Sequence, residues 1–365
     1  MTILLFALGL SLLIIGAEAL VRGASRMAAA LGISPLVIGL TVVALGTSSP
    51  ELAVSIKSTL AGQSGIALGN IIGSNISNIL LIIGLSALIL PLSISQQLIR
   101  LDVPLMIVLS VLVLILSADN SIGRTDGLIL ATGLVIYISF LIWHNRKENS
   151  ENAIKRAYES SKSENVKANW IKNIGLFLGG LLLLVIGSRW LITSAVSIAR
   201  HLGVSELVIG LTIIAAGTSL PEAVTSVIAA IRGERDIAVG NVVGSNILNI
   251  MGVLGITGLV APKGIEVSNA VIGFDLPIMI VVALACLPIF FSGCSISRLE
   301  GAFLLGYYFI YNAYLILSAA QHDTLPIFSN AVLYFLIPFT VIIMIIVTIQ
   351  EIRRSKNCPP DESHK

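Results

Sequence analysis

Two glutamates lie well inside apolar stretches of the chain. Glu51 ends the motif GTSSPE and Glu222 ends GTSLPE. A charged side chain at the centre of a bilayer costs about 2.5–3.5 kcal/mol on insertion scales, so such a residue is expected to face a cavity or a partner. Residues three and four positions earlier share its helix face. They carry hydroxyl oxygens in both copies: Thr47 and Ser48 before Glu51, and Thr218 and Ser219 before Glu222.

A proline stands immediately before each glutamate. Pro50 and Pro221 remove an amide donor and clash with the carbonyl one turn back. We therefore expect free carbonyl oxygens near Gly46 and Gly217. A bent helix with loose carbonyls beside a carboxylate suits a hard cation.

A second motif, GN-xx-GSN-xx-N, adds more oxygen ligands. Its polar side chains recur every four residues and therefore share one helix face. They are Asn70, Ser74 and Asn78 in the first copy and Asn241, Ser245 and Asn249 in the second, with Asn75 and Asn246 alongside. Ca²⁺ takes six to eight oxygen ligands, and two carboxylates would neutralise it. No Cys, His or Met joins the set, which disfavours a soft transition metal.

Each motif also has a purely structural interpretation. The GxxxG pairs Gly69/Gly73 and Gly240/Gly244 often serve only to pack helices closely. Ser and Thr can bond back to their own helix, and the prolines can be simple kinks. The duplication favours a functional role, because packing alone would have to explain the same costly glutamate twice.

The composition points to a membrane protein. Of 365 residues, 56% are apolar and 12% charged, with a mean hydropathy of +0.97. This excludes an ordinary water-soluble globule and a disordered chain, and a net charge of +2 gives no basic field for nucleic acid. Three cysteines without a CxxC disfavour a disulfide scaffold. Apolar runs predict an all-α protein with eleven spans, near 2–21, 35–60, 66–90, 101–118, 125–143, 171–193, 205–231, 237–261, 271–292, 299–318 and 326–350.

The chain repeats itself. Residues from Leu31 align with those from Leu202, and the offset of 171 continues without a gap to Ile94. Weaker echoes follow, such as DVPLMIV with DLPIMIV. Five helices per half is an odd number, so the second half must enter the membrane from the opposite side. Inverted halves are typical of secondary transporters, whose substrate sites lie near the midplane.

Charge sets the expected orientation. With the N-terminus outside, 17 of the 22 basic residues fall on the cytoplasmic side and 5 outside. The positive-inside rule favours this arrangement, with a cytoplasmic C-terminus. We predict a multi-pass protein of the cell (inner) membrane, with the lipid bilayer around it.

We divide the chain accordingly. The first repeat is 1–143, a polar cytoplasmic linker is 144–170, the second repeat is 171–318, an extra transmembrane helix lies in 319–350, and a cytoplasmic tail is 351–365. Asp102 and Asp275 precede prolines at helix starts and are expected to cap them. Glu18 with Arg22, and Arg189, are expected to lie toward helix ends and snorkel.

At the paired motifs the sequence resembles the sodium/calcium exchanger branch of the cation/calcium antiporter superfamily, in its prokaryotic form. The resemblance covers about residues 1–318. It implies ten helices in two inverted halves, central cation sites, alternating access and exchange of Ca²⁺ for Na⁺, with no cofactor.

The resemblance also implies roles for particular residues. Glu51 and Glu222 would be the central calcium ligands, assisted by Thr47 and Thr218. The residues lining the sodium and central sites would be Ser48, Ser219, Ser74, Ser245, Asn78 and Asn249, with Asn75 and Asn246 beside them.

Two departures from the family pattern stand out. Some relatives carry Asp where this chain has Asn249, which bears on potassium co-transport and on the ion count. The helix near 326–350 lies outside the ten-helix core.

Proton-coupled relatives typically carry an acid just after the GN pair, where this chain has Ile71, Ile72, Val242 and Val243. Sodium is therefore the favoured coupling ion.

The predicted function is a secondary active Ca²⁺/Na⁺ antiporter. A divalent cation/proton antiporter is the first alternative, and a cation channel the second. An enzyme is disfavoured, because the chain has no HExxH, no paired catalytic Asp motif and no Ser–His pair inside the membrane.

Overall fold

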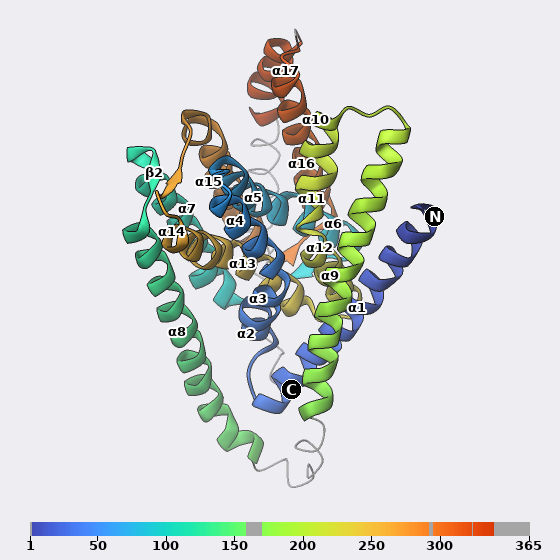
Figure 1. Ribbon diagram of the computed structural model, residues 1–365. Helices are drawn as coiled ribbons and strands as arrows, with labels where there is room; N and C mark the ends of the chain where they lie inside the picture. Colours follow the sequence, from blue (N-terminus) through green and yellow to red (C-terminus); the bar gives the residue numbers. More distant parts are fainter. Residues whose placement is uncertain (1, 158–169, 292–294, 323, 339–365) are drawn as a thin grey trace.

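The chain folds into two helical halves that follow one another in sequence. The computed structural model describes residues 2–157, 170–291, 295–322 and 324–338 (Figure 1). Within these residues nearly all regular structure is helical, interrupted by short π-helical or 3₁₀ turns, which carry the label η. The first half contains α1 (Thr2–Leu31), α2 (Pro35–Ile38), η1 (Gly39–Val43), α3 (Ala44–Thr47), α4 (Ser49–Leu60), α5 (Ser64–Ser77), η2 (Asn78–Ile83), α6 (Gly84–Ile89), β1 (Leu92–Ser93), η3 (Leu98–Asp102), α7 (Val103–Leu116), η4 (Ser117–Asp119), β2 (Ser121–Ile122) and α8 (Arg124–Ala157).

The second half repeats this order. It contains α9 (Trp170–His201), α10 (Glu206–Ile209), η6 (Gly210–Ile214), α11 (Ala215–Gly217), α12 (Leu220–Ile231), α13 (Arg235–Leu248), η7 (Asn249–Leu254), α14 (Gly255–Val260), β3 (Ile265–Glu266), η8 (Val271–Asp275), α15 (Leu276–Phe291), β4 (Ser295–Ile296) and α16 (Arg298–Ala319). Beyond it lie α17 (Leu325–Ala331) and η9 (Val332–Leu336), which begin the predicted eleventh span. The rest of that span and the tail lie outside the described residues.

The predicted spans correspond to helices, with three interruptions. Eight helices of the described chain are long and apolar enough to cross a membrane, and a bent pair, Pro35–Thr47 with Ser49–Leu60, makes a ninth. The counterpart of that pair is broken between α11 and α12, and the eleventh span is described only in its first part. The helix α8 runs on to Ala157, into the predicted linker, of which residues 158–169 lie outside the described chain.

Two small antiparallel sheets reveal the symmetry of the halves. One pairs β1 with β4 and the other pairs β2 with β3. The registers are Leu92 with Ile296 and Ser93 with Ser295, and Ser121 with Glu266 and Ile122 with Ile265. The strands β1 and β3 follow the equivalent helices α6 and α14, and β2 and β4 precede the equivalent helices α8 and α16, so exchanging the halves turns one sheet into the other.

The two sheets lie at opposite ends of the molecule. The 22-residue span Leu98–Asp119 connects β1 to β2 and separates them by roughly 30 Å. Because β1 and its copy β3 are therefore at opposite ends, the second half is inverted relative to the first. This confirms the predicted all-α fold of two inverted five-helix repeats. We name the two ends of the molecule the β1–β4 end and the β2–β3 end.

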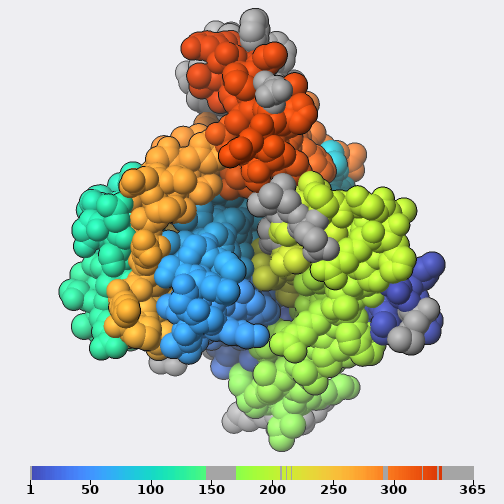
Figure 2. Space-filling model, turned by 45° about the horizontal axis from the view of Figure 1, so that its top comes forward, coloured from blue at the N-terminus to red at the C-terminus, as the bar shows by residue number. Residues whose placement is uncertain are grey.

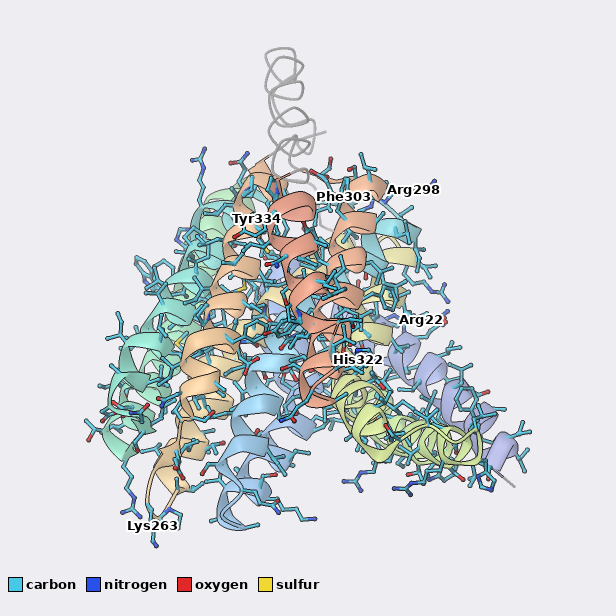
Figure 3. The ribbon with its side chains drawn as sticks, turned by 90° about the horizontal axis from the view of Figure 1, so that it is seen from above. Arg22, Lys263, Arg298, Phe303, His322 and Tyr334 are labelled. Atoms are coloured by element: carbon cyan, nitrogen blue, oxygen red, sulfur yellow. The ribbon has the colours of Figure 1, made fainter. Side chains whose placement is uncertain are left out.

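Glycines bring helices of the two halves into backbone contact. A methyl group at Gly9 would lie 2.9 Å from the carbonyl oxygen of Gly187, and one at Gly16 would lie 2.8 Å from that of Gly180. These contacts join α1 to α9, which run side by side in Figures 1 and 3. Small residues allow such close approach of helices in a membrane, where apolar burial gives no driving force.

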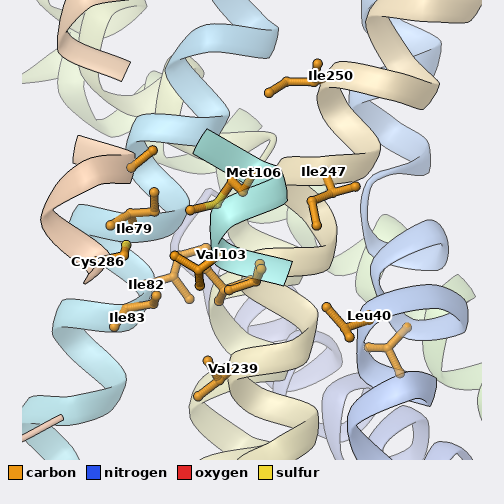
Figure 4. Packing of buried hydrophobic residues seen from close by; sticks show 14 of the residues in the cluster. Leu40, Ile79, Ile82, Ile83, Val103, Met106, Val239, Ile247, Ile250 and Cys286 are labelled. Carbon is orange, nitrogen blue, oxygen red and sulfur yellow. The ribbon is translucent and has the colours of Figure 1, made fainter. Parts of the chain in front are cut away.

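The centre of the molecule is built from α5–α6 and α13–α14. Most of their side chains are buried, whereas α1, α9 and α16 expose large apolar side chains such as Ile15, Leu182 and Phe309. An apolar face turned outward suits contact with lipid. The helix α7 inserts Val103 and Met106 between the two central helices (Figure 4).

Candidate cation-binding site

Each glutamate of the paired motifs lies in the first turn of a helix that follows a break. The helical backbone is interrupted at Ser48 and at Ser219, with φ and ψ of −81° and 4° at the first and −85° and 6° at the second. At the first break the chain bends by 43°. A carboxylate in the first turn is stabilised by the helix dipole. The sequence places the break here because a proline is tolerated in the first turn of a helix but not in its interior.

The two carboxylates come together inside the protein. Glu51 is 0% exposed and Glu222 1%. They are close enough to repel each other electrostatically. The Ser48 hydroxyl, from the first half, donates a hydrogen bond of 3.0 Å to Glu222 Oε1, from the second. Both oxygens of Glu51 and Oε2 of Glu222 have no hydrogen-bond partner in the described chain. A buried carboxylate without a partner is costly, so three oxygens are available to a cation.

Four asparagine side chains form hydrogen bonds between the central helices. Asn78 Nδ2 donates to Asn246 Oδ1 at 2.9 Å, and Asn249 Nδ2 donates to Asn75 Oδ1 at 3.1 Å. The repeat offset carries the first bond onto the second. The remaining oxygens, Asn78 Oδ1 and Asn249 Oδ1, are buried and have no described partner. Asn78 and Asn249 are also the first residues of η2 and η7, and π-helical turns often occur at functional sites.

The hydroxyl groups of the motifs surround the same region. Ser74, Ser219 and Ser245 are buried, and the structure shows no hydrogen-bond partner for their oxygens among the described residues. Thr47 is buried too, and its hydroxyl lies 3.2 Å from Val43 O and 3.1 Å from Asn241 Oδ1. Thr218 is only half-buried. Of the twelve predicted site residues, the other eleven are all buried.

Two asparagines of the second motif hold the glutamate-bearing helices. Asn70 Nδ2 donates to the backbone oxygen of Glu51 at 3.2 Å and to Ser55 Oγ at 3.0 Å. Asn241 makes the equivalent bonds to the Glu222 backbone and to Ser226. The sequence predicted that Asn70 and Asn241 share a helix face with the cation ligands, but it did not predict that they hold the glutamate-bearing helices in place. The offset of 19 residues from each glutamate, the same in both copies, was the available signal.

A comparison with known protein families decides the identity. The sodium/calcium exchanger protein family matches residues 1–143 and 172–317. The chain belongs to this family. The resemblance seen in the paired motifs is thereby confirmed, and the family is one of membrane exchangers.

Individual relatives support the same family assignment. The exchanger is 39% identical over 239 residues to the putative antiporter CaxA of Alkalimonas amylolytica, an alignment covering 65% of this chain and 74% of that protein. It is 32% identical over 270 residues to the sodium/calcium exchanger MaX1 of Methanosarcina acetivorans, with 66% and 77% covered. The solved structure of the sodium-calcium exchanger NCX_Mj, soaked with Na⁺ and Ca²⁺, matches with a TM-score of 0.72 and 30% identity over 86% of this chain and 97% of that one.

The two halves of the exchanger do not pack alike around the site. In the second motif, a methyl group at Gly244 would lie 2.6 Å from Leu40 Cα, and one at Gly240 would lie 2.9 Å from Leu36 O. Thus α2 and η1 press directly on α13. At the equivalent Gly69 and Gly73 of α5, a methyl group would meet no described atom within 4 Å.

This difference opens one end of the exchanger. The first turns of α5 lie at the β2–β3 end, where α5 contacts β3, and those of α13 lie at the β1–β4 end, where α13 contacts β1. The site is therefore covered at the β1–β4 end, while at the β2–β3 end α10 and η6 stand away from α5. Figure 2 shows the resulting recess between the blue surface of α4 and α5 and the yellow-green surface of α9 and α10.

Several expectations about single residues need correction. Asp102 does not cap α7, because its side chain makes no cap bond and instead accepts a hydrogen bond of 2.9 Å from the Tyr137 hydroxyl. The carbonyl oxygen of Gly46, which was expected to be free, accepts a hydrogen bond of 2.7 Å from Ser49 Oγ. The second copy has Leu220 in place of Ser49, so it cannot form the equivalent bond.

A contact of Asp275 repeats that of Asp102, and one polar group of α1 differs from expectation. Asp275 lies 3.5 Å from the Tyr311 hydroxyl, the counterpart of the Asp102 contact. Glu18 forms ion pairs with Arg22 and with Arg232, from the turn before α13, so it joins two helices rather than only snorkelling.

Methionine sulfur also takes part in the amide cluster, although the sequence kept methionine out of the site. Asn246 Nδ2 lies 3.3 Å from Met106 Sδ, and Asn75 Nδ2 lies 3.6 Å from Met279 Sδ. The echo DVPLMIV/DLPIMIV, which contains both residues, was the signal that could have found them.

Proposed function

We propose that the protein exchanges Ca²⁺ for Na⁺ across the cell membrane, with both cations bound as substrates between Glu51 and Glu222. The observation that carries this proposal is the meeting of two buried carboxylates, one from each inverted half, with three of their four oxygens unpartnered in the described chain. Two negative charges balance one Ca²⁺ or two Na⁺. The two loads compete for the same oxygens, which is the basis of exchange.

The neutral oxygens complete the coordination. Ca²⁺ takes six to eight oxygen ligands in flexible geometry, more than two carboxylates supply. The unpartnered oxygens of Asn78, Asn249, Ser74, Ser245 and Ser219 are the further candidates. Three or more His, Cys, Asp or Glu side chains do not cluster anywhere in the described chain. A site with two acids and many neutral oxygens favours hard cations over transition metals.

Alternating access follows from the inverted symmetry. In this conformation α2 and η1 cover the site at the β1–β4 end, and α10 and η6 leave it uncovered at the β2–β3 end. Exchanging the roles of the two halves would close the second end and open the first. The positive-inside rule assigns the β1–β4 end to the cytoplasm, so the conformation described is open to the outside.

A bound cation controls the change between the two conformations. Without a cation, the Glu51 and Glu222 carboxylates repel each other in a medium of low dielectric constant, which opposes closure over the site. Bound Ca²⁺ or Na⁺ screens the repulsion, so that closure becomes favourable. Because only a loaded transporter closes, movement of one ion is coupled to return of the other.

Sodium is the proposed coupling ion. The positions after the two GN pairs are filled by Ile71, Ile72, Val242 and Val243, all buried and apolar. They can neither carry nor release a proton.

The test is Ca²⁺ uptake into proteoliposomes under imposed Na⁺, K⁺ and proton gradients, each alone. We expect uptake driven by Na⁺, and expect Glu51→Gln and Glu222→Gln each to abolish it. Glu266→Gln changes an exposed acid of β3 and serves as the matched control, with unchanged uptake. Undiminished exchange in either site variant would overturn the central site. Uptake driven only by a pH gradient would indicate a proton antiporter, and flux without any counter-ion would indicate a channel.

A further inference from the structure

Two buried methionines touch the amide cluster at symmetric positions. Met106 of α7 is 1% exposed and Met279 of α15 is 2% exposed. Met106 Sδ accepts from Asn246 Nδ2 at 3.3 Å, and Met279 Sδ accepts from Asn75 Nδ2 at 3.6 Å. The proposed coordination of the cation does not use either sulfur.

Each contact continues through two amides to a free oxygen. On one side, Asn246 Nδ2 donates to Met106 Sδ and, at 3.4 Å, to the backbone oxygen of Asn75. Asn246 Oδ1 accepts from Asn78 Nδ2, and Asn78 Oδ1 remains unpartnered. On the other side, the same order runs from Met279 through Asn75 and Asn249 to Asn249 Oδ1. Both terminal oxygens are buried in the described structure.

Acceptors at the first amide fix the direction of each chain of bonds: Met279 Sδ for Asn75, and Met106 Sδ together with the Asn75 backbone oxygen for Asn246. A primary amide has a donor end and an acceptor end, whereas a thioether sulfur can only accept. If Asn246 turned over, its Nδ2 would face Asn78 Nδ2, two donors in contact. Asn78 would then have to turn as well, and its NH₂ group would replace the oxygen. An amide oxygen attracts a cation, and an NH₂ group repels it.

We propose that Met106 and Met279 are positioning residues, which fix the orientation of the four amides so that Asn78 and Asn249 present oxygen to the exchanged cation. This inference rests on the proposed function and extends it to residues outside the ligand set. Sulfur suits the task for two reasons. It is a weak acceptor that still distinguishes N–H from C=O, and it is soft, so it does not compete with oxygen for Ca²⁺ or Na⁺.

Leucine variants separate this role from simple packing. Met106→Leu and Met279→Leu keep an apolar side chain of similar volume but remove the acceptor, a swap that cores tolerate well. Met251→Leu is the matched control, because Met251 is also 2% exposed and lies in η7, next to Gly133 and outside the two chains of bonds. Each single variant tests its own chain of bonds, so the proposal remains testable if one of them does not fold.

The experiment measures Ca²⁺ binding to the purified full-length protein by calorimetry, and Na⁺-driven Ca²⁺ uptake as a function of Ca²⁺ concentration. We expect Kd and KM for Ca²⁺ to rise about tenfold in each single variant, the lower end of what loss of an outer-shell partner costs a metal site. We expect a larger rise in the double variant, kcat close to that of the wild type, and no change in Met251→Leu. A Kd equal to that of Met251→Leu in all three variants would overturn the positioning role and leave the exchanger function standing. A wild-type protein that neither binds Ca²⁺ nor takes it up would overturn the proposed function itself.

Discussion

The segments α2–η1–α3 and α10–η6–α11 have nearly the same sequence and different positions. Both contain LVIGLT and both end at a GTS motif. The first packs its backbone on α13, so that Val43 is 0% exposed, whereas Ile214, the equivalent residue of the second, is 49% exposed. Gly39 lies against Ile237 of α13, while a methyl group at its copy, Gly210, would meet no described atom within 4 Å.

The comparison shows that one copy is packed against the central helices and the other is not, as expected if, as proposed above, these segments are movable covers of the site. Local propensity cannot distinguish two copies of one sequence, so the difference between them belongs to the state of the whole molecule. The site helices, by contrast, are symmetric, since the bonds among their asparagines repeat from one half to the other. A symmetric centre with one packed and one unpacked cover is the arrangement expected for the alternating access proposed above.

The largest effect is expected from glycine substitutions beneath the covers. Gly244→Ala places a methyl group 2.6 Å from the Leu40 backbone, and overpacking of this kind costs about 1–3 kcal/mol. Gly73→Ala meets open space in this conformation, so we expect it to leave thermal stability unchanged. Both should abolish exchange in proteoliposomes, because turnover must close each end in turn. Full activity of Gly73→Ala would show that α10 and η6 never approach α5.

A smaller effect is expected from the serines at the two helix breaks. Ser48 donates to Glu222, whereas the oxygen of Ser219 has no partner in the described chain. Ser48→Ala should therefore lower the free energy of unfolding by about 0.6–1.7 kcal/mol, the range for hydrogen bonds between membrane helices, and Ser219→Ala by less. Thermal unfolding in the presence of a chelator compares them. Equal losses of unfolding free energy in the two variants would mean that Ser219 makes a hydrogen bond equivalent to that of Ser48 when no ion is bound.

The smallest effect concerns an ion pair present in only one half. Glu18 of α1 pairs with Arg232, whereas the equivalent positions are Arg189 and Ala61, which cannot form a salt bridge. Arg232→Ala should weaken closure of the β1–β4 end by about 0.2–1 kcal/mol, as for other exposed pairs.

The readout for this shift is the labelling rate of Gly65→Cys, in a background whose native cysteines are replaced by serine. Gly65 is exposed while the β2–β3 end is open, and its equivalent at the covered end, Asp236, is half-buried, so a side chain is tolerated there. We expect slower labelling in Arg232→Ala and no change in Lys263→Ala, which removes an exposed cation from the turn before β3. An unchanged labelling rate in Arg232→Ala would show that the ion pair does not affect the equilibrium between the two conformations.

Much of the fold could be predicted because its signals are local or repeated. Apolar runs located the helices, the offset of 171 residues revealed the two halves, and the odd number of helices in each half required the inversion. The glutamates drew attention because a carboxylate in an apolar helix is costly, and the structure indeed brings them together inside the protein.

Other parts of the site could not be predicted from spacing. The position two residues before a proline suggested that Asp102 is a cap, but the tertiary fold places the Tyr137 hydroxyl 2.9 Å from its carboxylate. Met106 looks like one more apolar residue of α7 until the packing sets its sulfur against Asn246. Such roles depend on which side chain of a distant helix lies opposite, and a single sequence does not record that.

The sequence alone determined the helices, the inverted duplication and the oxygen-rich character of the site, because periodicity, charge and residue chemistry are properties of the chain itself. Only the tertiary structure decided which amide bonds which and which of two equal covers lies closed. Those choices depend on contacts between residues about 170 positions apart and on a balance between states that a repeated sequence leaves open.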